Sequence, residues 1–257
     1  MGTLALVVAA NLASTLISVF LAAHLSFRWL SGLVDRLVHV SIGLLLATAL
    51  LHIVPEALQS GLAPAHLGWT LLAGILGLFV LEKMTLIHHT HHHEGDAHHH
   101  EHGHDAREAG RGAIPILVAD AFHNFTDGVV IAAAFLVDAP TGLMTALAVL
   151  AHEIPHEIGD FMILLNAAFT RRRAFAFMLL AGAAAVLGGI LGFFVLESAR
   201  SLLPYALALA AASFVYIALS DLLPELMRRS SMSRSLPEVA LVLLGVIIAL
   251  LAASLDR

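Results

Sequence analysis

Eight long apolar segments constrain the fold of this chain more than any other feature. They cover residues 4–23, 37–58, 67–88, 113–137, 141–168, 174–197, 203–227 and 237–255. Each is long enough to cross the ~30 Å hydrocarbon core of a bilayer as an α-helix. Charged residues make up only 12% of the chain, whereas soluble domains carry roughly 25%. We therefore predict an all-α membrane protein with eight transmembrane helices in a single domain over residues 1–257.

The positions of Lys and Arg predict how these helices are oriented. Eleven of the 13 basic residues fall in the connections after the first, third, fifth and seventh segments. Only Arg200 and Arg257 fall on the other side. Cytoplasmic connections are enriched in Lys and Arg, so we expect both termini outside the cytoplasm. The membrane that we expect is the cytoplasmic (inner) membrane of a bacterium.

One long hydrophilic stretch, residues 89–112, separates the third and fourth segments. Its runs of His alternate with acidic residues, a composition that cannot bury enough apolar surface to fold. We expect a disordered cytoplasmic loop that binds metal loosely; an engineered tag is the alternative, although tags are usually uniform and terminal. The His residues expected to bind metal there are His91, His92, His93, His98, His99, His100, His102 and His104.

The fifth segment carries a stripe of ionisable residues. At about 100° per residue, all of them share one face of a helix. Each would cost roughly 2.5–3.5 kcal/mol at the centre of a lipid-embedded helix, and a bound metal ion is one partner that offsets this cost. A structural polar cluster that holds helices together is the alternative. The residues of the stripe are His152, Glu153, His156, Glu157 and Asp160.

The fourth segment carries a matching set, His123, Asn124 and Asp127. A short turn near Ala139-Pro140 makes the fourth and fifth segments antiparallel neighbours. Asp127 and His152 both lie about 13 residues from that turn, so the two polar sets should meet near mid-membrane. We predict a metal site there, formed by His123, Asn124, Asp127, His152, Glu153, His156 and Glu157.

The ligand types indicate which metals this site would take. Imidazole and carboxylate groups suit Zn²⁺, with Fe²⁺, Mn²⁺, Co²⁺ and Cd²⁺ as further candidates. The chain has no Cys, so thiolate ligands and disulfides are excluded. A mixture of neutral and anionic ligands favours a metal ion that exchanges over one that stays permanently bound.

Two short motifs at the ends of the second and seventh segments resemble each other. His52 and Glu56 flank Pro55 in the first, and Asp221 and Glu225 flank Pro224 in the second. The two segments run in opposite directions, which is the pattern of an inverted repeat of helices one to three and six to eight around a central pair. We expect an ion pathway past the central site that includes His52, Glu56, Asp160, Asp221 and Glu225.

The two central motifs, His123 to Gly128 and His152 to Asp160, resemble the paired signatures of the ZIP (Zrt/Irt-like) metal transporters, closest to the LIV-1 branch. The resemblance implies a transporter domain that imports Zn²⁺ into the cytoplasm by an alternating-access, elevator-like movement of helices one, four, five and six. It also implies a binuclear site, with one ion on His123, Asp127, His152 and His156. The second ion would take Asn124, Asp127, Glu153 and Glu157.

The resemblance has one departure and several further implications. Some relatives place a carboxylate in the sixth helix beside the second ion, but here that helix has none before Glu197. We expect no enzyme activity and no prosthetic group, with Zn²⁺ as the transported ion and Fe²⁺, Mn²⁺ or Cd²⁺ as alternatives. The expected partners are the lipid bilayer and divalent metal ions, without nucleic acid; a homodimer is left open.

Two other functions fit parts of the sequence. Residues 152–156 match H-E-x-x-H, in which two His bind Zn²⁺ and Glu activates water, so an intramembrane zinc metalloprotease is one alternative. That function leaves Glu157, Asp160 and Asn124 without a role. A metal exporter is the other alternative, because exporters also carry His-rich loops.

Overall fold

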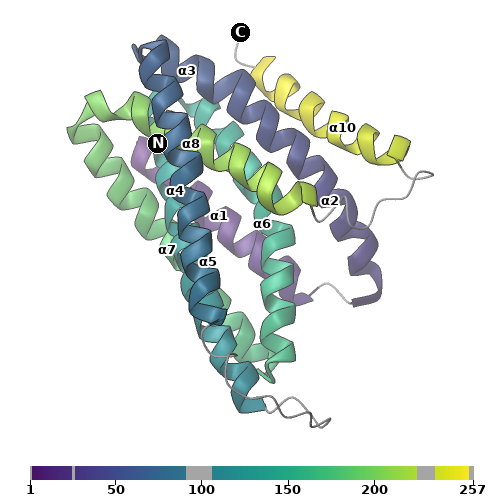
Figure 1. The fold of residues 1–257 in the computed structure, drawn as a ribbon. Helices are drawn as coiled ribbons and strands as arrows, with labels where there is room; N and C mark the ends of the chain where they lie inside the picture. The colour runs from purple at the N-terminus through teal and green to yellow at the C-terminus, as the bar shows by residue number, and fades with distance from the viewer. Residues whose placement is uncertain (1, 25–26, 91–105, 225–234, 255–257) are drawn as a thin grey trace.

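The computed structural model describes residues 2–24, 27–90, 106–224 and 235–254, and these residues contain helices and no β-strand. Its long helices are α1 (Thr3–His24), α2 (Phe27–Ala47), α4 (Pro64–Thr90), α5 (Ala106–Val137), α6 (Ala139–Asn166), α7 (Arg171–Ser198), α8 (Leu203–Tyr216) and α10 (Ser235–Ser254) (Figure 1). Shorter turns extend two of them: η1 (Thr48–Ile53) and α3 (Val54–Gln59) continue α2, while η2 (Arg200–Leu202) and η3 (Ile217–Leu222) flank α8. Eight helical segments in this order confirm the all-α membrane architecture.

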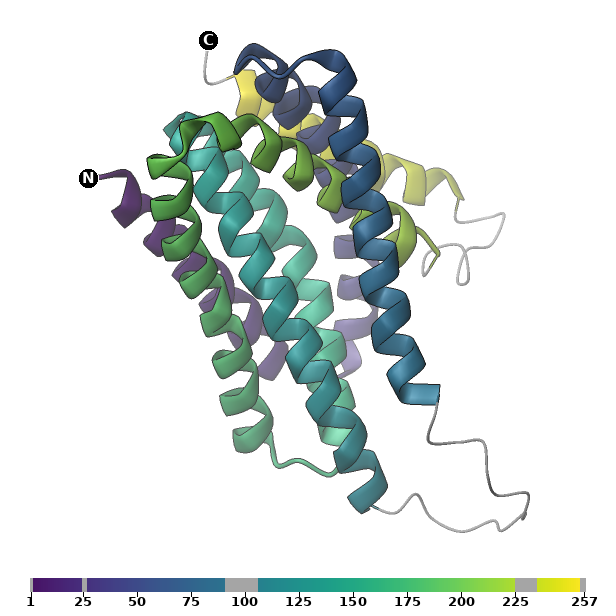
Figure 2. The same ribbon diagram turned by 60° about the vertical axis from the view of Figure 1, so that its left-hand side comes forward.

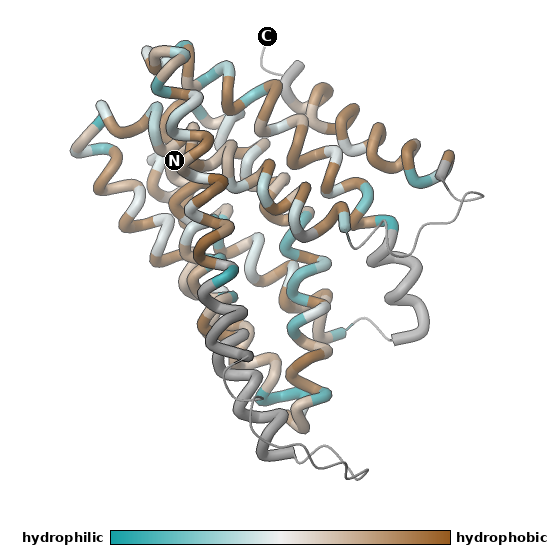
Figure 3. Tube along the Cα trace, viewed as in Figure 1, coloured by the Kyte–Doolittle hydropathy of each residue, from teal (hydrophilic) through white to brown (hydrophobic). Residues whose placement is uncertain are grey.

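Six of the described helices are long and apolar enough to cross a membrane. In α10 the apolar residues whose side chains are described are Leu236–Ala252, and α6 falls outside this set because polar residues line one of its faces. Figure 3 shows hydrophilic positions along α6 among helices that are mainly hydrophobic. The helix that carries the polar stripe is therefore one that hydropathy alone does not mark as membrane-spanning.

Two helices, α2 and α5, start earlier than the sequence predicted, and charged residues lie in both extensions. α2 starts at Phe27, ten residues before the predicted segment, and this extension contains Arg28, Asp35 and Arg36. Likewise α5 starts at Ala106, seven residues before the predicted segment, and this extension contains Arg107, Glu108 and Arg111. Hydropathy marks where a helix enters lipid, whereas backbone hydrogen bonding continues beyond that point. The helices consequently cover 89–90 and 106–112 of the predicted loop, and its eight predicted His ligands lie outside the described residues.

The helices pack in two groups. In the first, α1 packs against α6 and α7, and α5 packs against α6 and α7. In the second, α2 packs against α10, and α4 packs against α8. Figure 2 shows α5 and α6 running side by side with α1 and α7 along them. The first group corresponds to helices one, four, five and six of the sequence prediction.

Each helix contact in one half of the chain has a counterpart in the other half, as an inverted repeat requires. α1 packs on α6 as α7 packs on α5, and α2 packs on α10 as α8 packs on α4. The start of α1 and the end of α10 both lie toward the end of the bundle where α5 meets α6 (Figure 2). The described helices thus place the beginning and end of the chain toward the same end of the bundle.

The two motifs that suggested the repeat share an unusual backbone. η1 and η3 are π-helical turns of six residues each, and they precede Pro55 and Pro224. A proline removes one backbone hydrogen bond, and a π-helical turn is one way to accommodate the change. The same local structure at both positions supports the match between the two motifs.

Pro155 does not interrupt α6, and a side chain from α2 explains why. A proline at position 155 leaves the carbonyl of Ala151 without its intrahelical N–H donor. The hydroxyl of Ser41 lies within hydrogen-bonding distance of that carbonyl and of the carbonyl of Leu37 in its own helix. α2 therefore supplies the hydrogen bond that α6 lacks beside its polar stripe.

Candidate metal centre

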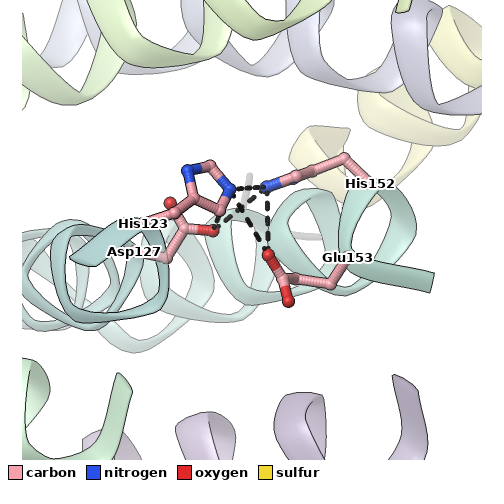
Figure 4. Close-up of side chains that lie close together, drawn as sticks. All are labelled: His123, Asp127, His152 and Glu153. Atoms are coloured by element: carbon pink, nitrogen blue, oxygen red, sulfur yellow. Dashed lines mark hydrogen bonds and ion pairs between the residues drawn. The ribbon is translucent and has the colours of Figure 1, made fainter. Parts of the chain in front are cut away.

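Four ionisable side chains from α5 and α6 converge in the interior (Figure 4). His152 Nε2 lies 3.1 Å from Asp127 Oδ2 and 3.3 Å from His123 Nε2. Glu153 Oε1 lies 3.4 Å from His123 Nε2 and 3.7 Å from His152 Nε2. The last measured pair, His123 Nε2 and Asp127 Oδ2, is 3.9 Å apart. We call these four residues the inner cluster.

The spacing of the inner cluster suits one small divalent ion. With metal–ligand bonds of about 2.0–2.2 Å, the ligand atoms of a tetrahedral Zn²⁺ site lie roughly 3.3–3.6 Å apart. The measured separations of 3.1–3.9 Å bracket that range. Two imidazoles and two carboxylates are also a donor set that Zn²⁺ accepts in proteins.

Hydrogen bonding leaves His152 in the tautomer that a metal ligand needs. His152 Nδ1 lies 3.1 Å from the carbonyl oxygen of Ala148, and a carbonyl can only accept, so Nδ1 carries the proton. In the neutral ring this leaves the Nε2 lone pair facing Asp127 and His123. The ring of Phe214, in α8, stands edge-on to it with 6.2 Å between the ring centroids.

Burial excludes solvent from most of the inner cluster. The side chains of Asp127, His152 and Glu153 are only 2–3% exposed, and that of His123 is 24% exposed. Carboxylates buried this deeply carry a large desolvation cost unless a cation balances them. The cluster is therefore built to hold positive charge, from protons or from a metal ion.

A second set of ligands lies next to the inner cluster. His156 Nδ1 lies 3.8 Å from Asp120 Oδ1 and 3.7 Å from Asp160 Oδ2. We call Asp120, His156 and Asp160 the outer cluster. Asp120 and Asp160 are buried, whereas the side chain of His156 is 43% exposed.

The structure groups the predicted ligands differently from the resemblance. Glu153 takes the place in the inner cluster that was expected for His156, and His156 faces Asp120 and Asp160 instead. Asn124 donates from Nδ2 to Asp120 Oδ1 at 2.9 Å. Glu157 is fully buried but belongs to neither cluster, and its carboxylate oxygens have no hydrogen-bond partner among the described residues.

Asp120 was not predicted, although the sequence contains a signal for it. It lies three residues before His123, at about 60° on the helical wheel, between His123 at 0° and Asn124 at about 100°. Extending the polar stripe of α5 by one turn would have found it.

Among the predicted pathway residues whose side chains the structure describes, Asp160 belongs to the outer cluster, whereas His52 and Glu56 belong to neither cluster. His52 Nε2 is 3.1 Å from the hydroxyl oxygen of Thr141 near the start of α6. Glu56 is partly buried in α3. Asp221 lies in η3, where only its backbone is described, and Glu225 lies outside the described residues.

The clusters also bear on the metalloprotease alternative. In an H-E-x-x-H protease both His residues bind the same Zn²⁺. Here the first His, His152, belongs to the inner cluster and the second, His156, to the outer one. This arrangement does not favour a protease.

Residues 87–253 match the family model of the ZIP zinc transporters. The chain is 34% identical over 241 residues to the zinc transporter ZIP13 of Pongo abelii, covering 84% of this chain and 66% of that protein. It is 38% identical over 144 residues to the human zinc transporter ZIP10, covering 54% of this chain and 17% of that protein. The zinc transporter YKE4 of Saccharomyces cerevisiae is 29% identical over 220 residues, with 79% and 64% covered.

The chain thus spans about two thirds of ZIP13 and less than a fifth of ZIP10. The names of these relatives describe transporters, in agreement with the prediction that the chain is not an enzyme. The family match covers α5 to α10 and includes both clusters. The predicted resemblance is confirmed: the chain belongs to the ZIP zinc transporter family, on its LIV-1-like branch.

Proposed function

We propose that this protein imports Zn²⁺ across the cytoplasmic (inner) membrane of a bacterium, with both termini outside the cytoplasm. The observation that carries the proposal is the inner cluster, in which α5 and α6 present four metal ligands to one another at Zn²⁺ spacing. The zinc transporter names of the relatives point to the same ion. Fe²⁺, Mn²⁺ and Cd²⁺ are the competitors to test, because an affinity order alone selects no metal.

The proposed transport mechanism is alternating access. The group formed by α1, α5, α6 and α7 would carry the bound ion past the group formed by α2, α4, α8 and α10, in an elevator-like movement. The more extensive packing within each group supports this division, and α2 packs against α6 where the two groups meet. His52 and Glu56 would lie on the entry side of the pathway, and Asp221 and Glu225 on the exit side.

The proposal keeps two further predictions about metal. A second ion would bind beside the first on Asn124, Asp127, Glu153 and Glu157, which makes the site binuclear. Buried Glu157, without a hydrogen-bond partner, supports a need for positive charge there.

The His-rich loop over 89–112 would bind cytoplasmic metal loosely. The whole chain would form one transporter domain, with or without a homodimer partner.

The decisive experiment measures radioactive Zn²⁺ uptake into proteoliposomes with His123→Ala, Asp127→Ala and His156→Ala. We expect each variant to abolish uptake at unchanged protein content, because each removes a ligand from a buried cluster. Glu197→Gln, which changes an exposed carboxylate in α7, serves as the control and should transport normally. Competition by Fe²⁺, Mn²⁺ and Cd²⁺, with and without a pH gradient, ranks the metals.

Two results would contradict the proposal. Near-normal uptake by all three Ala variants would separate the clusters from transport. Expression that lowers cellular zinc and raises zinc tolerance would mean export instead of import.

A further inference from the structure

We infer that the outer cluster, Asp120, His156 and Asp160, is a separate binding position for the transported divalent ion, reached after the inner cluster. This inference rests on the proposed transport function. The outer cluster shares no residue with the second ion position implied by the family resemblance. Imidazole with two carboxylates suits Zn²⁺ or Cd²⁺.

The donor atoms of the outer cluster are arranged for a ligand. One atom from each residue lies within 4.8 Å of the others. Asp120 is 2% exposed and Asp160 is 7% exposed, and each has a buried Oδ2 without a hydrogen-bond partner. The contacts of 3.7 and 3.8 Å to His156 are too long for hydrogen bonds, so the three groups face one another without satisfying one another.

Asn124 holds Asp120 of the outer cluster in place. Its side-chain amide donates to Asp120 Oδ1 at 2.9 Å and to the backbone carbonyl of Asp120 at 3.1 Å. A ligating carboxylate is commonly fixed in this way by a hydrogen bond from a neighbouring side chain. Asp120 Oδ2 remains available for an ion.

His123 connects the two positions. Its ring centroid lies 5.5 Å from that of His152 in the inner cluster and 5.3 Å from that of His156 in the outer cluster. Rotation of one imidazole therefore brings a ligand atom toward either position. An ion can pass from one cluster to the other without losing all of its protein ligands at once.

The outer cluster lies toward one end of the bundle. Asp120 precedes His123 in α5, and Asp160 follows His152 in antiparallel α6, so both lie further from the α5–α6 turn than the inner cluster does. His156 is 43% exposed, whereas His152 is 2% exposed. The ion would therefore leave the sealed cluster through the accessible one, toward the end at which α5 begins.

The absence of Cys from the chain allows a direct test of contact. Asp160→Cys introduces one thiol, and X-ray absorption of the full-length variant loaded with Zn²⁺ should show a sulfur neighbour at ~2.3 Å. Asp127→Cys provides the same measurement for the inner cluster. Thr145→Cys, a buried position of α6 outside both clusters, is the matched control and should show no sulfur neighbour.

Because a thiolate itself attracts zinc, amide variants provide a second measurement. Asp120→Asn and Asp160→Asn should each bind one equivalent of Cd²⁺ less than the unmodified chain in equilibrium dialysis. The His-rich segment contributes equally to all variants, so it cancels in the difference. Zn²⁺ uptake should fall in both variants while the inner cluster still binds its ion.

The outcomes separate this inference from the proposed function. A zinc–sulfur bond in Asp127→Cys but not in Asp160→Cys, or a full complement of Cd²⁺ in both Asn variants, overturns the inference and leaves transport intact. A sulfur neighbour in Thr145→Cys equal to that in Asp160→Cys also counts against it. If neither Asp127→Cys nor Asp160→Cys shows a zinc–sulfur bond, and the unmodified chain takes up no Zn²⁺, the proposed function itself is excluded. If the Cys variants fail to fold, the two Asn variants decide the question.

Discussion

Gly128 follows Asp127 directly and allows α5 to approach α7 at backbone contact distance. A Cβ at position 128 would lie 1.9 Å from the carbonyl oxygen of Ala185 and 2.7 Å from the backbone nitrogen of Gly189. The contact is reciprocal, because a Cβ at Gly188 would lie 2.0 Å from the carbonyl oxygen of Phe125. Small residues at helix contacts in membranes permit this close packing. The position of Asp127 therefore depends on Gly128, which is not itself a metal ligand.

We predict that Gly128→Ala destabilises the protein and reduces uptake. The obstructing atoms belong to the backbone, so α5 must move, at a cost of about 1–3 kcal/mol or more. For a chain of this size, this corresponds to a melting temperature lower by about 2–4 °C per kcal/mol in thermal unfolding. Gly159→Ala, where nothing lies within 4 Å, is the control and should behave normally. Equal melting temperatures for the two variants would show that α5 and α7 do not pack this closely.

At the level of single residues, the sequence predicted which face of each helix carries ligands but not how the ligands divide. His152 and His156 share one face of α6, four residues and about 6 Å apart along the helix axis. Their assignment to different clusters depends on Asp120, which lies opposite His156 and was outside the motif considered. Which residue of α5 lies opposite each His of α6 depends on how the two helices pack, and helical periodicity alone does not predict it.

Among the helices, α6 depends on α2 for the integrity of its most important turn. The carbonyl of Ala151 precedes His152 directly, and Pro155 deprives it of an N–H donor. Ser41 of α2 supplies a hydroxyl within hydrogen-bonding distance. This contact joins the two groups of helices that the proposed transport mechanism moves apart.

We predict that Ser41→Ala lowers stability by about 1–3 kcal/mol, because it leaves a buried carbonyl unsatisfied. The loss should be smaller by about 1 kcal/mol in a Pro155→Ala background, where α6 regains its own N–H donor. Thermal unfolding in detergent of both single variants and the double variant measures this coupling. Ser18→Ala, which removes a buried hydroxyl within α1, is the control and should be additive with Pro155→Ala. Additivity of Ser41→Ala and Pro155→Ala would exclude this compensation.

The helical elements were largely predictable because their apolar lengths match a bilayer. α1 at Thr3–His24 and α10 at Ser235–Ser254 fall within a few residues of the predicted segments. The early start of α2 was not predicted, because Arg28, Asp35 and Arg36 lower the hydropathy of its first turns and hydropathy does not report a helix outside lipid. The two motifs around Pro55 and Pro224 were matched in the sequence, but the π-helical form of η1 and η3 depends on local hydrogen bonding and was not predicted.

At the scale of the whole molecule, the described ligands of both clusters come from α5 and α6. The segment 91–104 joins α4 to α5 and lies outside the described residues. Its composition predicts metal binding of a different, loose kind. Transport and metal sensing would then reside in separate parts of the chain.

We predict that deletion of residues 91–104 alters regulation more than transport. The initial rate of Zn²⁺ uptake should stay within about twofold, because surface connections tolerate such changes. The response of that rate to Zn²⁺ preloaded on the cytoplasmic side should weaken. Proteoliposomes with and without internal Zn²⁺ provide the measurement, and replacement of the segment by a Gly/Ser linker of equal length controls for the length of the connection. Loss of uptake in the linker variant would place part of the transport machinery in this segment.

The polar face of α6 has a consequence for how the protein reaches its membrane. A helix with Glu153, Glu157 and Asp160 on one side is a poor substrate for the translocon by itself, since each acidic group costs roughly 2.5–3.5 kcal/mol near mid-membrane. Asp138 caps the start of α6 one residue after α5 ends, so the two helices leave the ribosome as a hairpin. The two helices would then enter the lipid together, and α5 would have to pack against α6 before the translocon releases either helix.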